Sequence, residues 1–286
     1  MRVRMKILKS SLITMAFCLL TLLTTSCQLK ANSTTTGNPF VTFYATGSSA
    51  ATTVAKQMWH GLLSLFLPTA SALPAPGTMM DAVGNTVTVT KIWFTIGEIE
   101  FKYAELPDGS EVDGSDVSFT GPYTVDMLSS SPTPLDAGNI TIDLMRRIKV
   151  KLVKTTSVPG GAPAGLSNNS IYMEGTVNGH AFIFTSQDEA VMEIYGPNLV
   201  TALENSSLLL QLRTANLIRR IDLSAITSST TISESNKVNA TNPCPNINSS
   251  ASDLYTCIRG GFETESTLGR DDNGDHEIES NESSFD

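Results

Sequence analysis

The run from Thr86 to Lys102 constrains the fold of this chain more than any other segment. Val, Ile, Thr, Phe and Trp recur along it, and these side chains fit the pleated, half-buried surface of a β-sheet. At 17 residues it is too long for one ordinary strand of about 5–6 residues. Its apolar positions also change from odd to even numbers and back, in the order Val87, Val89, Ile92, Phe94, Ile96, Ile99 and Phe101. A change of phase needs a bulge or a bend, and Gly97 is a natural place for one. We therefore expect two strand halves that form the spine of an all-β domain.

The clearest local signal is a hairpin. The segments Ile171–Val177 and His180–Phe184 both have strand composition, and only Asn178 and Gly179 separate them. An Asn-Gly pair between two strands predicts a type I′ turn, in which both turn residues take a positive φ angle.

Further strands are predicted on both sides of this hairpin. They are expected at Val117–Leu128, Ile140–Lys154, Ala190–Tyr195 and Leu208–Leu212. Ala215–Leu223 is either a short helix or a last strand. Because strands and helices do not alternate, we predict an antiparallel β-sandwich of the immunoglobulin or transthyretin-like type over residues 81–226.

Other compositions flank this domain. Residues 27–50 are rich in Ser, Thr, Asn and Gly and are predicted to be a tether. Residues 51–80 are predicted to hold an amphipathic helix, which ends at Pro68, and a Pro/Ala linker. The apolar face of that helix either packs on the β domain or lies in a membrane interface. Residues 227–286 are a polar, acidic tail, predicted to be mostly irregular unless a cross-link or an ion orders it.

The first 26 residues have the pattern of an export signal. Four cations and no acid precede an apolar stretch, Leu12–Leu23, which is too short to span a bilayer. Thr24, Thr25 and Ser26 then lead into Cys27, and small residues before a cysteine resemble a bacterial lipobox. The resemblance implies that Cys27 carries lipid as the first mature residue, with an ordinary cleaved signal as the alternative. Gln28 after it implies the outer membrane, by resemblance to Gram-negative lipoproteins.

Two cysteines remain in the mature chain once Cys18 is removed and Cys27 is lipidated. They are Cys244 and Cys257. A single pair in an exported chain predicts a disulfide. It would close a loop of about 14 residues and stabilise the fold by roughly 3 kcal/mol.

The charge of the chain argues against nucleic-acid binding. The sequence has 19 basic and 28 acidic residues. Without the four signal-peptide cations, 15 basic residues face 28 acids, a net charge of −13. Such a surface repels polyanions. We therefore expect contact with the membrane through the lipid rather than through an attraction of the protein surface to anionic lipid, and a protein or glycan as a possible further partner.

The acidic tail contains one candidate metal site. Its segment from Asp271 to Glu282 resembles EF-hand and related calcium loops. The resemblance assigns ligand positions to Asp271, Asn273, Asp275, Glu277 (through its main-chain carbonyl) and Glu282. Calcium takes six to eight hard oxygens, which this spacing supplies. Position 6 is His276 where that family has Gly. The alternative is a solvated acidic tail.

No recognisable catalytic motif occurs in the sequence. The three histidines, His60, His180 and His276, do not stand beside a Ser or Cys nucleophile in a known pattern. Glu98 and Glu100 would share one strand face, where alternation makes a solvated face the better interpretation than a catalytic pair. We therefore predict a protein that is not an enzyme.

Several phrases in order resemble bacterial lipoproteins built on a β-sandwich domain of unknown function. They begin at Asp81 (DAVGNTVTVT), Thr95 (TIGEIEFK), Gly121 (GPYTVDML) and Ile171 (IYMEGTVNG). The resemblance covers about residues 81–226 and implies fold and location but no catalytic residue. The expected function is that of a lipid-anchored, non-catalytic binding or structural module of the cell envelope. The alternatives are a carbohydrate- or protein-binding adhesin component, or an envelope hydrolase with an unrecognised site.

Overall fold

The structure is a computed structural model that describes residues 40–47, 78–103, 117–129, 131–139, 144–189, 191–201, 205–244, 247–278 and 281–284. The predicted signal peptide, Cys27, the tether up to residue 39 and the predicted helix at 52–67 lie outside these residues. So do residues 104–116.

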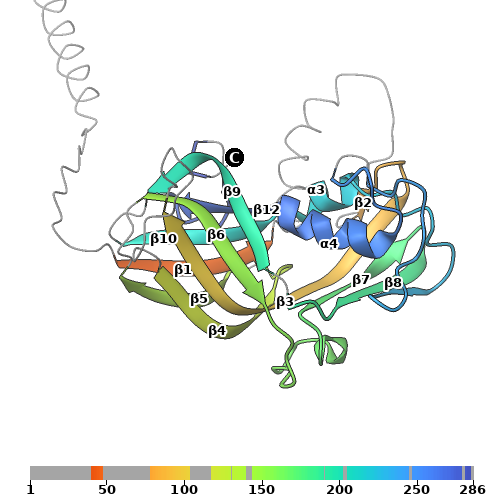
Figure 1. Cartoon of the computed structure of the whole chain (residues 1–286), viewed down its shortest axis with the longest axis horizontal. Coiled ribbons are helices and arrows are strands. Elements are labelled where there is room, and N and C mark those ends of the chain that lie inside the picture. Colours follow the sequence, from red (N-terminus) through yellow and green to blue (C-terminus); the bar gives the residue numbers. More distant parts are fainter. Residues whose placement is uncertain are drawn as a thin grey trace, which may run out of the picture. The chain divides into compact units, whose positions relative to one another are not determined.

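The described chain is mostly β-strand, and its strands form two sheets (Figure 1). The smaller sheet has the order β12–β10–β1–β5, with bounds Ser266–Asp271, Ser206–Leu212, Phe40–Gly47 and Thr133–Asn139. The larger sheet has the order β11–β8–β7–β3–β6–β9, with bounds Thr230–Ile232, His180–Ser186, Ile171–Val177, Thr86–Tyr103, Leu144–Leu152 and Val191–Thr201. Strands β2 (Thr78–Met80) and β4 (Val117–Asp126) also pair with β3. The predicted all-β class is confirmed, and the two sheets are consistent with a sandwich.

Strand β3 is the spine that the sequence predicted. Its first half pairs with β2 and β7, and its second half pairs with β4 and β6. The register shifts between Ile96 and Glu98 against both β4 and β6, and between Val89 and Lys91 against β7. These two bulges fall at the two changes of apolar phase. They keep the apolar side chains on the core face, where Ile92, Phe94, Ile96, Ile99 and Phe101 are fully buried.

The predicted hairpin is confirmed. Strands β7 and β8 pair in antiparallel register from Ile171–Ser186 to Val177–His180. Asn178 and Gly179 have φ angles of 49° and 84°, as a type I′ turn requires.

Two strand pairings differ from the predicted antiparallel arrangement. Strand β1 runs parallel to β10, and β11 runs parallel to β8. Both pairings join strands that are far apart in the sequence, so no tight turn dictates their direction.

Residues 40–47 were predicted to be part of the tether, and this was wrong. They form β1, which lies between β10 and β5 in the smaller sheet (Figure 1). Phe43 and Ala45 are fully buried there. Ser, Thr and Gly residues around this strand mask it in the sequence, because they give the region the composition of a linker.

The boundary predicted at residue 226 does not separate an irregular tail from the domain. The segment beyond it contains β11, helix α4 (Leu254–Thr264) and β12. Leu254, Ile258, Phe262 and Leu268 belong to the same buried cluster as the β3 side chains. The Ala215–Leu223 segment, which the sequence left open between helix and strand, overlaps helix α3 (Thr214–Arg219).

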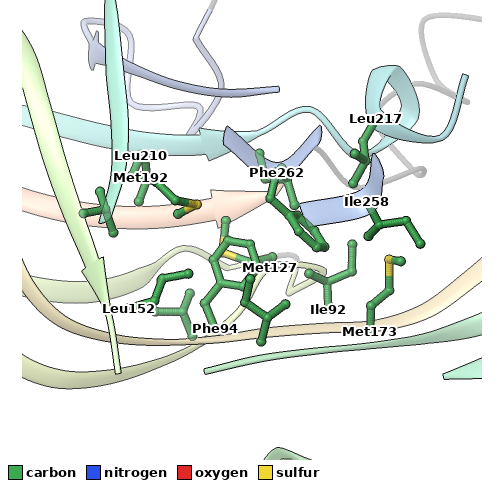
Figure 2. Packing of buried hydrophobic residues seen from close by; sticks show 14 of the residues in the cluster. Ile92, Phe94, Met127, Leu152, Met173, Met192, Leu210, Leu217, Ile258 and Phe262 are labelled. Atoms are coloured by element: carbon green, nitrogen blue, oxygen red, sulfur yellow. The ribbon is translucent and has the colours of Figure 1, made fainter. Parts of the chain in front are cut away.

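The buried cluster has two differently built parts, which share β3. We call the first the sandwich half: the smaller sheet packed on β4, β6, β9 and the second half of β3. Phe43 of β1 meets Phe101 of β3 there at 5.4 Å between ring centroids. We call the second the helix-covered half: α3 and α4 with β7, β8, β11 and the first half of β3. Phe262 of α4 points at Phe94 of β3, 5.2 Å away between centroids (Figure 2).

Candidate functional site

The predicted calcium loop begins where β12 ends. The Asp271 side chain is only 1% exposed, and both of its oxygens accept hydrogen bonds from the loop that follows. Gly274 N–H donates to Oδ1 at 2.7 Å, and His276 N–H donates to Oδ2 at 3.2 Å. The carboxylate therefore organises the turn of the loop from inside.

Glu282 closes the loop from its other end. Its Oε1 accepts hydrogen bonds from the backbone N–H groups of Asp272 at 2.8 Å and Asn273 at 3.2 Å. Arg270 N–H donates to the Ser283 carbonyl at 2.8 Å beside it. The first and last predicted ligands thus bind the same short stretch of backbone, and the chain returns to pair with β12.

His276 occupies the position where the resembled calcium loops have Gly. Its φ angle is 65°, so it adopts the left-handed conformation that the loop requires there. Its Nδ1 lies 3.2 Å from Asp271 Oδ2, and its ring lies 6.1 Å from the Tyr44 ring. The His276 backbone therefore adopts the left-handed conformation that glycine would adopt at this position.

The other predicted ligands form local turns. Asn273 Oδ1 accepts from Asp275 N–H at 2.8 Å, and Asp275 Oδ1 accepts from Glu277 N–H at 2.9 Å. Ile278 is half-buried against Gly269 of β12, since a Cβ on that glycine would lie 2.8 Å from Ile278 Cγ2. These contacts place the apolar residue of the predicted loop against the sheet and leave the polar ones outside.

The carboxylate and amide oxygens of this loop are ligands that calcium prefers. The carboxylates of Asp271 and Glu282, however, already accept hydrogen bonds from backbone N–H groups. Both oxygens of Asp271 have hydrogen-bond donors, so an ion would share them with the loop or replace the contact to His276 Nδ1. Within the described residues, no group of three or more His, Cys, Asp or Glu side chains is arranged to hold a metal. Calcium binding therefore stays a prediction from the sequence.

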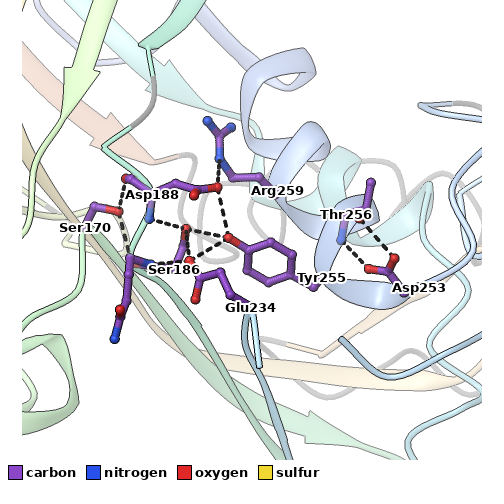
Figure 3. Close-up of polar contacts among 9 residues, drawn as sticks. Ser170, Ser186, Asp188, Glu234, Asp253, Tyr255, Thr256 and Arg259 are labelled. Carbon is purple, nitrogen blue, oxygen red and sulfur yellow. Dashed lines mark hydrogen bonds and ion pairs between the residues drawn. The ribbon is translucent and has the colours of Figure 1, made fainter. Parts of the chain in front are cut away.

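A second polar cluster, which the sequence did not reveal, surrounds Tyr255 of α4 (Figure 3). The Tyr255 hydroxyl lies 2.8 Å from Glu234 Oε1, 3.0 Å from Asp188 Oδ2 and 3.0 Å from Ser186 Oγ. Glu234 also accepts a hydrogen bond from Gln187 N–H at 2.6 Å. The cluster thus ties the helix to the end of β8 and to the segment after β11.

Burial and neighbouring carboxylates set the ionisation of this cluster. Burial raises the pKa of Tyr255 far above its ordinary value, and the hydrogen bonds to Glu234 and Asp188 raise it further. Burial alone would raise the pKa of Glu234, but hydrogen bonds from Gln187, Tyr255 and Ser186 outweigh it and lower that pKa. At neutral pH Tyr255 is therefore a neutral donor and Glu234 a charged acceptor.

Arg259, one turn after Tyr255, completes the cluster. Its Nε lies 3.8 Å from Asp188 Oδ2, which forms an ion pair. Ser170 holds the same segment from the other side, because its Oγ donates to the Asp188 carbonyl at 2.7 Å. These contacts hold the segment after β8 against helix α4. The carboxylates of Asp188 and Glu234 both have partners on this helix or beside it.

Helix α4 itself had a readable signal. Asp253 caps its first turn by accepting from Thr256 N–H at 2.7 Å, and Asp is a preferred residue at that position. Leu254, Ile258 and Phe262 then repeat every four residues, which is the spacing of one helix face. The partners of Tyr255 had no such signal, because they come from distant segments.

The remaining candidate residues fall in separate places. Cys244 and Cys257 are fully buried, with Cα atoms 5.7 Å apart, a separation that suits a disulfide. His180 is exposed beside the hairpin turn. Glu98 and Glu100 alternate with buried Ile99 on β3, so they lie on the outer face of the sheet, as expected. Cys27 lies outside the described residues.

No protein family, curated protein or solved structure matches this chain. Among the described residues, no helix is both long and apolar enough to cross a bilayer. The resemblance to envelope lipoproteins therefore stays a prediction.

Proposed function

We propose that this chain is a lipid-anchored protein of the bacterial cell envelope, in which a β-rich ectodomain acts as a non-catalytic binding or structural module. The observation that carries the proposal is the N-terminal sequence. Four cations without an acid, an apolar core at Leu12–Leu23 and small residues before Cys27 form an export signal with a lipid attachment site.

The position of β1 in the chain leaves only a short connection between the proposed lipid and the folded domain. Because the smaller sheet begins at Phe40, only residues 28–39 separate Cys27 from the folded domain. Twelve residues span at most about 40 Å when fully extended. The proposed lipid would therefore keep the ectodomain close to the membrane surface.

The cysteine pair supports export to an oxidising compartment. We infer that Cys244 and Cys257 form a disulfide, which their separation of 5.7 Å allows. Disulfides persist in the periplasm and at cell surfaces but are rare in the cytosol. This cross-link would tie the polar segment before α4 to the helix.

We assign the proposed binding role to loops, because loops on a rigid β scaffold often contact ligands. The loop from Asp271 to Glu282 and the hairpin tip at Asn178–Gly179 are the candidates for a protein or glycan ligand, as in an adhesin component. The hydrolase alternative is supported least. The carboxylates of Asp188 and Glu234 are near each other, but both accept from Tyr255, which favours a structural role.

Labelling of growing cells with radioactive palmitate tests the proposal. The wild-type chain is expected to incorporate label and to fractionate with membranes, whereas Cys27→Ser is expected to lose the label. Cys18→Ser is the matched control, because Cys18 lies inside the apolar signal and should be removed with it. An unlabelled wild-type chain that is nevertheless cleaved would overturn the lipid anchor and leave an ordinary secreted protein.

A further inference from the structure

The smaller sheet places the acidic loop beside the start of β1. Phe40, the first residue of β1, pairs with Asn139 at the end of β5. Strand β10 pairs with β1 on the other side, and its Ser207 pairs with Asp271, where the acidic loop begins. We call this end of the smaller sheet the entry end, because the first described strand starts there.

Strand β3 finishes at the entry end. Phe43 of β1 contacts Phe101 near the end of β3, at 5.4 Å between ring centroids. Tyr103, the last residue of β3, pairs with Met145 near the start of β6, and residues 140–143 alone join the end of β5 to that start. The start of β3 lies 18 residues away along the strand, a length of at most about 60 Å.

Two interlocked turns lie at the start of β3. They are the β2–β3 turn (residues 81–85) and the β7–β8 turn, and we call them together the double turn. Asp81 Oδ1 accepts from Asn85 N–H at 2.8 Å, and Asn178 Nδ2 donates to Asn85 Oδ1 at 2.8 Å. Figure 1 shows β2, β7 and β8 on the side of the domain opposite to β5 and β10. The two candidate binding loops therefore belong to opposite ends of β3.

The two ends differ in surface chemistry. At the double turn, Met80 and Val83 are 55% and 58% exposed. At the entry end, Asp272 and Asp275 are exposed, and acidic side chains are repelled by anionic lipid. Attraction therefore does not bring the entry end to a membrane, and only a covalent anchor would hold it there.

The length of the chain before β1 decides which end stays near the bilayer. Residues 28–39 separate Cys27 from Phe40 and span at most about 40 Å. The entry end can never be farther than this from a lipid on Cys27. The double turn has no such limit, because most of the length of β3 separates it from the entry end.

We propose that the entry end faces the bilayer and that the double turn is presented away from it, within reach of a protein partner. This inference rests on the proposed lipid anchor. Of the two candidate loops, it assigns the ligand to the β7–β8 turn with its neighbours Met80 and Val83, and leaves the acidic loop on the membrane side.

Energy transfer to labelled lipid tests the orientation. The full-length lipidated chain is placed in phosphatidylcholine vesicles that contain rhodamine-labelled lipid. A donor dye is attached to Asn139→Cys at the entry end or to Val83→Cys at the double turn, since both positions are exposed. Cys244 and Cys257 are fully buried and should not take up the dye. We expect transfer from position 139 to be several times stronger than from position 83.

Equal transfer from the two positions, or stronger transfer from position 83, would overturn the orientation while leaving the anchor intact. The same two variants in a Cys27→Ser background are the control and should show no transfer. If the chain with Cys27 also shows none and takes up no palmitate, the anchor itself fails and the orientation fails with it.

Streptavidin measures access for a protein-sized partner. With biotin on the same two cysteines, binding at position 83 should be equally fast on vesicles and in the Cys27→Ser background. Binding at position 139 should be several times slower on vesicles. Equal slowing at both positions would contradict the outward presentation of the double turn.

Discussion

The two halves of this protein bury their apolar side chains in different ways. In the sandwich half, sheet packs on sheet, and Phe43 and Phe101 meet from strands in the two layers. In the helix-covered half, a helix packs on a sheet, and Phe262 of α4 meets Phe94 and Phe184. The same strand, β3, supplies an aromatic side chain to both contacts.

The two halves differ in how the layer that covers the larger sheet is held in place. The smaller sheet is held to itself by three ladders of backbone hydrogen bonds. The helix α4 has no ladder and comes from a polar stretch of sequence. Its attachment depends on one apolar face and on the cluster around Tyr255, to which the proposed Cys244–Cys257 disulfide would add. The helix-covered half should therefore be the more sensitive of the two to single changes.

The largest expected effect comes from truncating the contact between α4 and β3. Phe262→Ala removes a fully buried ring, and we expect it to lower the free energy of unfolding by about 3–5 kcal/mol. Urea unfolding measures this loss. Phe43→Ala is the matched change in the sandwich half and should cost less, because ladders of backbone hydrogen bonds also hold the strand that carries Phe43. A Phe262→Ala midpoint equal to that of the wild type would show that α4 unfolds separately from the rest.

The proposed disulfide is expected to act on one half only. Replacing Cys244 and Cys257 by Ser should lower the free energy of unfolding by about 3 kcal/mol, in the chain-entropy account of a loop this short. Hydrogen exchange should speed up in α4, β7 and β8 before it does in β1 and β10. Reductant should reproduce the loss in the wild-type protein and have no effect on the double variant. A wild-type protein indifferent to reductant would contradict the cross-link.

Two adjacent glycines test how closely α3 and α4 pack. A Cβ at Gly261 would lie 2.4 Å from Leu217 Cδ1, whereas the nearest atom to a Cβ at Gly260 is 3.7 Å away. Gly261→Ala should cost about 1–3 kcal/mol through overpacking. Gly260→Ala should stabilise the helix by about 0.5–1 kcal/mol, because it reduces the freedom of the unfolded chain. Thermal melting of the pair measures both. Equal effects would mean that the helices are not in tight contact.

Calcium is expected to stabilise the sandwich half instead. At a concentration tenfold above the dissociation constant, binding would add about 1.4 kcal/mol and slow hydrogen exchange in β12 and β10 more than in α4. Calorimetry and melting with and without a chelator measure this. Asp275→Ala is the variant of choice, because Asp275 is exposed and Asp271→Ala would also remove the hydrogen bonds that shape the loop. The absence of binding heat would leave the loop as a structure closed by its own hydrogen bonds.

The smallest expected loss of stability comes from removing the hydroxyl of Tyr255. Tyr255→Phe should cost about 0.5–1.5 kcal/mol at neutral pH. Tyr123→Phe is the matched control in the sandwich half, because Tyr123 donates to the exposed Asp136 at 2.9 Å; it should cost less. Melting temperatures of the two variants make the comparison, and a larger loss in Tyr123→Phe would contradict it.

The same cluster predicts a pH dependence with a definite sign. The pKa of Glu234 is lowered in the folded state from its ordinary value of 4.5. Its contribution to stability is therefore complete above that value and is lost as the pH falls through the folded pKa. In Tyr255→Phe, Glu234 loses one of the hydrogen bonds that lower its pKa. The decline of the melting temperature toward acidic pH should then be shallower than in the wild type. An unchanged slope would exclude this carboxylate as a contributor.

The parts of the fold that could be predicted are those encoded within a few neighbouring residues. The phase changes along β3 and the Asn178–Gly179 turn are local, and the structure has both where the sequence indicated them. Strand β5 was missed because Pro134, Asp136 and Gly138 give it the composition of a turn. Strand β1 was missed because it looks like part of a linker until β10 and β5 pair with it on both sides.

The candidate sites also divide into one built from neighbouring residues and one built from distant segments. The loop from Asp271 to Glu282 was visible because its residues follow one another at fixed spacing. The left-handed conformation of His276 in that loop needed the structure, since few residues other than Gly adopt it. The cluster around Tyr255 was not visible at all, because Ser186, Asp188 and Glu234 reach it from separate segments.

By itself, the sequence determined the strand-rich class, the bulged spine, the hairpin and the order of oxygen-bearing side chains in the acidic loop. Each of these depends on side-chain alternation, turn chemistry or spacing within a few residues. Only the tertiary structure decided that a polar C-terminal segment supplies a core helix and an edge strand, and that β1 runs parallel to β10. Those outcomes depend on contacts with residues between 54 positions away, as for Leu212 and Ser266, and 168 positions away, as for Phe94 and Phe262. A one-dimensional pattern does not encode which distant surfaces will meet.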